Sequence, residues 1–330
     1  MYKDINNVCI IGGKEDMQNA LAISRPAANN VVVFNTINND VFNSFIKYLD
    51  VAQKSVETYT KAIKSFSRYL QSNNINRPTR QDVLDYKAYL EPTHKPATIN
   101  LYIIATRLFF EWTEQQGIYP NIAEHIKGKK INREPKKDAL TLTQVKEILQ
   151  NIDTSTQQGL RDYAIVTTAI TCGLRTIELS RLTLNDIRQC GDNMVLDVLG
   201  KGRDEHEQVI LPLATYKVIL NYLATRDTKD GTQPVFVSMS NKNKGGQMTT
   251  RSISRIIKNT FVDTGYNTDH LTAHSCRHTA VTLALLNGNS VQEVQQMARH
   301  KNIATTMIYA HNLEKAQNTC TNNIANAIFD

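Results

Sequence analysis

The sequence predicts a mainly α-helical protein with a small β-sheet, built as a helical domain followed by a mixed α/β domain. Three observations lead to this prediction. Apolar residues recur at alternating steps of three and four through residues 39–118, which is the helical period. Residues 194–212 instead have strand-like composition on both sides of a glycine turn. The length of 330 residues exceeds one average domain, which favours two.

Residues 39–125 predict a small helical bundle, with helices near 39–51, 54–72, 79–91 and 96–117. Asparagine and proline separate them, and Gly117 closes the last one. That last helix is apolar nearly all round, so we expect it to be the most buried of the four. The preceding residues 1–38 are polar with two short apolar runs, and we assign them no fold.

A basic segment at 126–139 interrupts the periodicity and is interpreted as the domain linker. Its basic residues are Lys127, Lys129, Lys130, Arg133, Lys136 and Lys137. Such a charge run is most often a solvated, flexible face. Because six cations close together favour a polyanionic partner, we expect it instead to follow the phosphate backbone of a bound nucleic acid duplex.

The second domain, residues 140–311, is predicted to embed a short sheet among helices. Thr143 is expected to cap its first helix, and a second helix follows near 160–172. Strand-like runs at 194–203 and 208–212 predict a hairpin or a three-stranded sheet. The remaining helices are expected near 249–263, 274–287, 290–298 and 302–311, followed by an Asn-rich tail at 312–330.

Composition limits the class of protein. The net charge of +7 favours a polyanionic partner, although many basic proteins bind no nucleic acid. Five scattered cysteines without a C-x-x-C pair indicate neither a zinc site nor a disulfide framework, which fits a reducing cytosol. No apolar stretch reaches membrane-spanning length, so we expect a cytoplasmic protein without a membrane partner.

Six residues of the second domain have the side chains needed to cleave a phosphodiester through a covalent protein–phosphate bond without a metal. They are Arg175, Lys201, His274, Arg277, His300 and Tyr309. Tyr309 is the candidate nucleophile, and the two arginines would hold the phosphate through their planar guanidinium groups. Lys201, in a Gly-Lys-Gly turn, would protonate the leaving 5′ oxygen. His274 would exchange a proton with Tyr309 or its phosphate, and His300 would donate a hydrogen bond to a phosphate oxygen.

Each of these residues alone has an ordinary structural explanation. Most of the 13 tyrosines must be packing residues, and Arg175 could simply pair with Glu178 three positions on. That pairing is also compatible with Glu178 orienting the guanidinium. His278 is assigned to structural support, because adjacent residues on a helix face different directions. The functional interpretation therefore rests on the order and spacing of the whole set.

The motifs that carry the set resemble the tyrosine recombinases, the phage-integrase and Xer-like family. The resembling segments are Thr-Ala-His274-Ser-Cys-Arg277-His278, Ala-Arg-His300, Thr-Met-Ile-Tyr309-Ala-His, Gly-Leu-Arg175-Thr-Ile-Glu178 and Leu-Gly-Lys201-Gly. The resemblance implies a helical core-binding domain and a catalytic domain that clamp duplex DNA at a specific recombination site. It also implies a 3′-phosphotyrosyl intermediate and strand exchange through a Holliday junction in a homotetramer, without ATP, metal or other cofactor.

Three features concern details of this resemblance. Arg299 stands where the family usually has glycine, and we expect it to touch DNA or a neighbouring subunit. The tail has apolar residues at Ile324, Ala325, Ile328 and Phe329, which are consistent with a helix that docks on an adjacent protomer. Residues 1–38 look too short for a complete arm-binding domain, which favours an integrase without arm sites or a resolvase-like enzyme.

Two other functions remain open at this point. A DNA-binding architectural protein of the same fold would bind without cleaving, and a type IB topoisomerase would relax supercoiled DNA without a recognition site. The target sequence stays open too, because base readout depends on which side chains reach the major groove. The choice among integration, excision, inversion and dimer resolution depends on how the sites are arranged.

Overall fold

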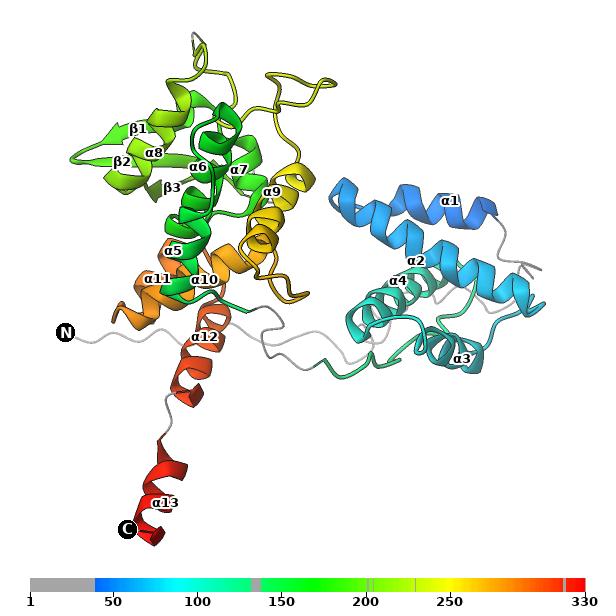
Figure 1. Cartoon of the computed structure of the whole chain (residues 1–330). Coiled ribbons are helices and arrows are strands. Elements are labelled where there is room, and N and C mark those ends of the chain that lie inside the picture. Colours follow the sequence, from blue (N-terminus) through cyan, green and yellow to red (C-terminus); the bar gives the residue numbers. More distant parts are fainter. Residues whose placement is uncertain are drawn as a thin grey trace, which may run out of the picture. The chain divides into compact units, whose positions relative to one another are not determined.

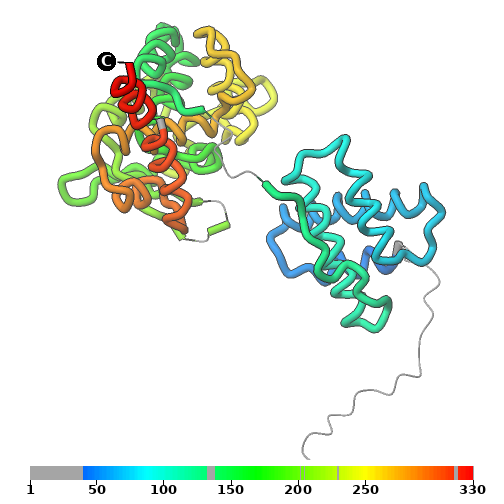
Figure 2. Tube along the Cα trace, turned by 90° about the horizontal axis from the view of Figure 1, so that it is seen from below, coloured from blue at the N-terminus to red at the C-terminus, as the bar shows by residue number. Residues whose placement is uncertain are grey.

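The computed structural model describes residues 39–131, 138–200, 202–203, 205–228, 230–316 and 319–329. The chain divides into two compact units, Met1–Asn132 and Arg133–Asp330 (Figures 1 and 2). Among the residues singled out from the sequence, Arg133, Lys136, Lys137 and Lys201 lie outside the described residues, as does the segment 1–38.

The first unit is the expected helical bundle. Its helices are α1 (Asn39–Tyr48), α2 (Gln53–Ser72), α3 (Arg80–Leu90) and α4 (Pro96–Gln115). Proline suits the first position of α4, because the backbone N–H that it lacks would have no partner within the helix. Helix α3 begins with a capping box, in which Thr79 and Asp82 satisfy each other's backbone N–H groups. The proline and the capping box thus fix where α4 and α3 begin.

Helix α4 is the most buried helix of this bundle, as predicted. Phe109 is completely buried, and its ring stacks on Phe42 with 4.9 Å between the ring centroids. Phe45 meets the same ring edge-on at 5.4 Å. Such pairs contribute about 0.5–1.5 kcal/mol beyond the burial of their area. The aromatic cluster thus fastens α1 to α4.

The first residues of the predicted linker are attached to this unit. Asn100 of α4 donates from Nδ2 to the carbonyl oxygen of Lys129 at 2.9 Å and accepts the Lys129 N–H at Oδ1. Gly128 permits this approach, since a Cβ there would lie 2.5 Å from Asn100 Oδ1. The Lys129 ammonium group pairs with Glu91 at 2.5 Å. Lys127 and Lys130 remain exposed.

The second unit combines helices with a three-stranded antiparallel sheet in the order β1-β2-β3. Before and within the sheet come α5 (Leu142–Gln150), α6 (Gln157–Thr171), α7 (Thr176–Arg181), a 3-10 turn (Leu184–Asp186), β1 (Ile187–Cys190), β2 (Asn193–Leu199) and β3 (His206–Ile210). After it come α8 (Leu213–Leu223), α9 (Thr250–Asp263), α10 (Ala273–Leu286), α11 (Val291–Ala298), α12 (Ile303–Ala316) and α13 (Cys320–Phe329). The mainly α fold with a small sheet is confirmed.

The cap of α5 differs from the prediction. Thr141, not Thr143, precedes the helix, and its hydroxyl accepts the N–H of Gln144 at 3.2 Å. Gln144 returns a contact, since its Oε1 accepts the Thr141 N–H at 2.9 Å. Thr143 cannot form this box, because the residue three positions after it is Lys146.

Helix α6 forms the centre of the second unit, where it contacts α8, α9 and α10 (Figure 1). Residues 164–170 of α6 are all buried. The core continues through Leu196 and Val209 of the sheet to Ile219 of α8. Helix α6 ends just before the loop that carries Arg175, so this rigid core positions the first candidate catalytic residue.

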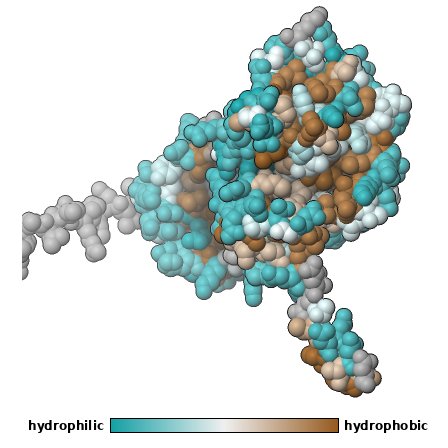
Figure 3. Space-filling model, turned by 90° about the vertical axis from the view of Figure 1, so that its left-hand side faces the viewer, coloured by the Kyte–Doolittle hydropathy of each residue, from teal (hydrophilic) through white to brown (hydrophobic). Residues whose placement is uncertain are grey.

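The C-terminal helices form a smaller apolar cluster of their own. Val281 of α10 packs with Val294 and Ala298 of α11, and Tyr309 of α12 lies against them. Helix α13 has no buried residue, and Ile324, Ile328 and Phe329 are exposed on it, as the apolar tip of the protrusion in Figure 3 shows. Within the described parts of the chain, no helix combines the length and apolar character needed to cross a membrane.

Candidate active site

Arg175 lies at the start of α7, where the chain leaves the core helix α6. The turn uses Gly173, whose φ of +59° is in the left-handed region that favours glycine. Arg175 is the N-cap residue of α7, and its backbone N–H donates to Glu178 Oε2 at 2.8 Å. Its Nη1 donates to Glu178 Oε1, also at 2.8 Å. Glu178 therefore fixes both the backbone and the guanidinium of Arg175.

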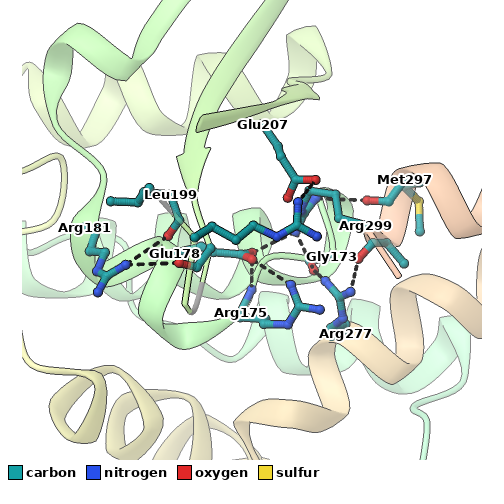
Figure 4. A network of polar contacts seen from close by, with 12 residues as sticks. Gly173, Arg175, Glu178, Arg181, Leu199, Glu207, Arg277, Met297 and Arg299 are labelled. Atoms are coloured by element: carbon teal, nitrogen blue, oxygen red, sulfur yellow. Dashed lines mark hydrogen bonds and ion pairs between the residues drawn. The ribbon is translucent and has the colours of Figure 1, made fainter. Parts of the chain in front are cut away.

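Glu178 is a buried carboxylate held between two arginines (Figure 4). Its Oε2, which also accepts the Arg175 N–H, accepts a hydrogen bond from Arg299 Nη2 at 2.7 Å. Burial raises the pKa of Glu178, but the charge of Arg299 and the hydrogen bonds from Arg175 outweigh that effect and hold the pKa below its ordinary value. The carboxylate is thus ionised at neutral pH and can anchor both guanidinium groups.

Arg277 lies on α10 with only 4% of its surface exposed. Its Nη1 donates to the carbonyl oxygen of Gly173 at 2.7 Å, and its Nη2 donates to the carbonyl oxygen of Ala298. Burial and the neighbouring guanidiniums lower the pKa of Arg277, although an arginine remains charged in proteins. Arg277 therefore joins the Arg175 turn to the end of α11.

From the sequence we expected Arg299 to point outward and touch DNA or a neighbouring subunit. Its side chain is buried instead. Arg299 ends α11 with φ +54° and ψ +45°, and its side chain is only 4% exposed. The guanidinium turns inward, where it donates to Glu178, to the carbonyl oxygen of Met297 at 2.9 Å and to that of Gly173 at 3.4 Å. The left-handed backbone aims the side chain into the arginine network.

Tyr309 and His278 meet through their side chains. The Tyr309 hydroxyl is hydrogen-bonded to His278 Nδ1, with 5.2 Å between the ring centroids. Burial raises the pKa of the Tyr309 phenol, and the charge of Arg277 offsets part of that rise. His278 therefore contacts the candidate nucleophile directly, whereas the sequence had suggested only structural support for it. The spacing of four from His274 is the signal for this, because it puts both histidines on one face of α10.

The other two histidines lie on either side of this pair. The ring of His274, which is exposed, lies 5.2 Å from that of His278. His300 Nδ1 is hydrogen-bonded to the Thr306 hydroxyl at 2.9 Å, and its ring is nearly parallel to that of Tyr309 at 6.4 Å. Burial and the positive charge of the three arginines lower the pKa of His300 to about 4, so it is neutral at pH 7.

Lys201 belongs to the connection between β2 and β3 and lies outside the described residues. The two residues before it are held close to α7, since Arg181 Nη1 donates to the carbonyl oxygen of Leu199 at 3.5 Å (Figure 4). The same Nη1 donates to the carbonyl oxygen of Gly200 at 3.1 Å. Arg181 lies on the short helix that Arg175 begins. The end of β2 is therefore tied to the element that carries the first arginine.

A basic hollow of about 710 Å³ opens beside His274 and was not located from the sequence. Helix α9 lines it with Arg251, Arg255 and Lys258, and Asp269 is the acidic residue among its lining. The three cations recur at steps of four and three, so they share one face of the helix. Lys258 is partly engaged, because its Nζ donates to the carbonyl oxygens of Thr268 at 2.7 Å and Leu271 at 3.1 Å.

The family to which this chain belongs follows from comparison with known protein families. The model of the phage integrase family matches residues 138–316, more than half of the chain. The chain belongs to the phage integrase family. A second model, the N-terminal SAM-like domain of phage integrases, matches residues 40–118. Both parts of this family's architecture, the core-binding and the catalytic domain, are therefore present.

Curated relatives in the family include the tyrosine recombinase XerD of Listeria innocua, 28% identical over 290 residues, which cover 83% of this chain and 94% of XerD. The tyrosine recombinase XerC of Corynebacterium glutamicum is 31% identical over 65% of this chain and 68% of its own length. Among solved structures, the XerH recombinase bound to its difH substrate has a TM-score of 0.68 at 18% identity, covering 86% of this chain and 89% of XerH. A lambda integrase dimer on a core site has a TM-score of 0.65 at 15% identity, covering 81% and 96%. This chain therefore shares its fold with the XerH recombinase and with lambda integrase.

Proposed function

We propose that this chain cleaves and rejoins duplex DNA at a specific site, with Tyr309 as the nucleophile. The observation that carries the proposal is the hydrogen bond between the Tyr309 hydroxyl and His278, close to the charges of Arg277 and Arg175. A partly buried phenol next to a proton acceptor and fixed cations has what nucleophilic attack on a phosphodiester requires.

Arg175 and Arg277 would hold the scissile phosphate. Arg175 keeps 30% of its side chain exposed, so its guanidinium can reach a substrate while Glu178 orients it. Arg277 is held by two carbonyl oxygens and brings a second fixed charge. Charge that develops on the non-bridging oxygens in the transition state would meet donors that need no rearrangement. This use requires arginine, because lysine lacks the planar fork.

The proton transfers follow from the same contacts. Tyr309 attacks phosphorus and passes its phenolic proton to His278, from which His274 can carry it toward solvent. The bond from phosphorus to the 5′ oxygen breaks, and Lys201 supplies the proton that this oxygen takes up. The product is a 3′-phosphotyrosyl bond at Tyr309 and a free 5′-hydroxyl. Attack by a 5′-hydroxyl of another strand reverses every transfer and rejoins the DNA.

His300 would act as a neutral hydrogen-bond donor. Thr306 engages its Nδ1 at 2.9 Å, which leaves Nε2 as the nitrogen that would meet a phosphate oxygen. With its pKa lowered to about 4, the ring does not add a charge at neutral pH. It would therefore position the phosphate through a directional hydrogen bond and not through the attraction of a positive charge.

The basic hollow and the linker would hold the duplex. Arg251 and Arg255 of α9 line the hollow beside His274 and would contact phosphates or base edges near the scissile bond. Lys127 and Lys130 are exposed on the linker and would contact the backbone farther away, as we infer also for Arg133, Lys136 and Lys137. Lys129 would contribute less, because its charge is already paired with Glu91.

The active assembly on DNA would be a homotetramer. A lambda integrase tetramer is known on a Holliday junction, and this chain shares its fold. Helix α13 exposes Ile324, Ile328 and Phe329, an apolar face that a neighbouring protomer would cover. We infer strand exchange through such a junction, in the cytoplasm, with the outcome set by the arrangement of two sites.

Cleavage of a nicked suicide duplex tests the proposal. The cognate site is first selected from random duplexes with the full-length protein, and the nick then lets the short fragment that carries the new 5′-hydroxyl diffuse away after attack. We expect a covalent protein–DNA complex with the wild type and none with Tyr309→Phe. Tyr266→Phe removes a phenol that bonds Glu147 instead and should still form the complex. Binding without any covalent complex in the wild type would favour an architectural protein. Relaxation of a plasmid that lacks the site would favour a topoisomerase.

A further inference from the structure

Arg299 is a buried arginine with a backbone conformation that favours glycine. Its φ of +54° is left-handed, which is unfavourable for a residue with a Cβ. Helices commonly end in this conformation, and glycine is the usual residue there. An arginine at this position therefore destabilises the turn unless its side chain makes compensating contacts.

Those contacts all lie inside the candidate active site. Arg299 Nη2 donates to Glu178 at 2.7 Å and to the Gly173 carbonyl oxygen at 3.4 Å, and Nη1 donates to Met297 at 2.9 Å. Its Nε–H meets no acceptor among the residues that the structure describes. A side chain that leaves one buried donor unmatched is not optimal for stability alone.

Two of these acceptors also hold the candidate phosphate-binding arginines. Glu178 accepts from Arg175 on one side and from Arg299 on the other, each at 2.8 Å or less. The Gly173 carbonyl oxygen accepts from Arg277 at 2.7 Å and from Arg299 at 3.4 Å. Arg299 thus contacts the anchor of each guanidinium (Figure 4), and it is not among the residues that line the basic hollow.

We propose that Arg299 is a positioning residue, which holds Glu178 and the Gly173 carbonyl so that Arg175 and Arg277 are fixed before DNA binds. This inference rests on the proposed function, since it assigns those two arginines to the phosphate. Arg299 itself makes no contact with DNA. A side effect is a third positive charge close to His300, which agrees with the low pKa of that histidine.

The first test requires no DNA. In the free protein, the ¹H–¹⁵N signals of the arginine Nε–H groups report how firmly each guanidinium is held. We expect Arg299→Gly to shift the signals of Arg175 and Arg277 and to speed their exchange with water, at a temperature below the thermal midpoint of the variant, while glycine preserves the turn. Arg161→Lys is the control, because Arg161 is 6% exposed and paired with Asp162 at 2.7 Å. Unchanged signals in Arg299→Gly would overturn the proposal, whatever the protein does to DNA.

The second test measures cleavage of the nicked suicide duplex in a single turnover. A misplaced phosphate-binding group costs up to about 100-fold, so we expect Arg299→Gly to slow cleavage by roughly 10- to 100-fold. Binding to the intact site should change by less than about threefold, because no phosphate contact is lost. Arg299→Lys keeps the charge without the fork and should recover only part of the rate, whereas Arg161→Lys should cleave normally.

A double-mutant cycle then tests the route through Glu178. In a Glu178→Gln background, the Arg299→Gly change should slow cleavage by less than about threefold, because the shared anchor is already altered. Full, additive losses would contradict the proposal, as would weakened DNA binding with normal cleavage of the bound duplex. If the wild type forms no covalent complex at all, the proposed function fails, and the arginine signals of the free protein still decide the role of Arg299.

Discussion

The Tyr309 hydroxyl and His278 Nδ1 form a hydrogen bond that joins α12 to α10. The contact places a proton acceptor beside a phenol whose pKa burial raises. Tyr309 is therefore protonated in the free protein at neutral pH and, in the proposed mechanism, would lose its proton as it attacks. We propose His278 as the acceptor, because its ring contacts the hydroxyl. The small apolar cluster of Val281, Val294 and Ala298 packs against the tyrosine ring.

Removing this acceptor should slow cleavage. General base catalysis by a positioned side chain contributes about 10²- to 10⁴-fold, so His278→Gln should reduce the single-turnover rate by an amount in that range. Tyr309 would then transfer its proton to water or to His274. His311→Gln is the matched control, because His311 is an exposed histidine on α12 that pairs with Glu314. A His278→Gln protein that cleaves as fast as the wild type would remove His278 from the mechanism.

Protein stability should depend on the titration of His300. Its pKa falls from an ordinary 6.5 to about 4 on folding, so between these pH values the unfolded chain binds a proton that the folded chain does not. The free energy of unfolding should therefore decrease as the pH is lowered from 6.5 to about 4. Glu178, whose pKa is lowered, loses its contribution only as the pH falls below about 4.5. Urea unfolding at several pH values should show a shallower decrease in His300→Asn over the upper window. An identical decrease in that variant would contradict the assignment.

The cations of α9 should differ in their effect on DNA binding. Each phosphate contact that is lost lowers the slope of log K against log salt by about one, so Arg255→Ala should flatten the slope by roughly that amount. Lys258→Ala should mainly lower the thermal midpoint, because Lys258 holds two carbonyl oxygens of the following turn. Arg188→Ala removes an arginine paired with Asp197 on the sheet and should leave the slope unchanged. Equal slopes for Arg255→Ala and wild type would place the duplex elsewhere.

The aromatic core of the first unit should determine its stability. Replacing a buried phenylalanine by alanine costs about 3–5 kcal/mol, and Phe109 packs against both Phe42 and Phe45. Phe109→Ala should lower the free energy of unfolding by that amount in urea, whereas Phe109→Leu, which keeps most of the volume, should cost clearly less. A loss below about 1 kcal/mol for the alanine variant would mean that α1 is not fastened to α4 as described.

Helix ends and turns that depend on residues close together in the chain could be predicted from the sequence. The periodicity of 39–118 and its prolines predicted α1 to α4 closely, since helix ends depend on local capping and on φ restrictions. The glycine turn between β2 and β3 was predicted for the same reason. The prediction placed the cap at Thr143, two residues too late, although the signal is local: a glutamine lies three residues after Thr141 and a lysine three residues after Thr143.

Features that depend on distant contacts were not predicted. Helix α8 contains β-branched and aromatic residues that are as common in strands as in helices. Its packing against α6 favours the helical conformation. The inward turn of Arg299 depends on a carboxylate that lies 121 residues earlier in the chain. The hollow beside His274 forms only where α9 passes α10. The identities of the candidate catalytic residues were thus accessible, but the network that holds them was not.

Identification of the residue that becomes attached to DNA tests the central claim most directly. Wild-type protein is trapped on the nicked suicide duplex, digested with protease and nuclease, and the nucleotide-bearing peptide is sequenced by mass spectrometry. The account predicts a nucleotide linked through its 3′ phosphate to Tyr309 and to no other of the 13 tyrosines. A linkage to a different residue, or one through a 5′ phosphate, would contradict it.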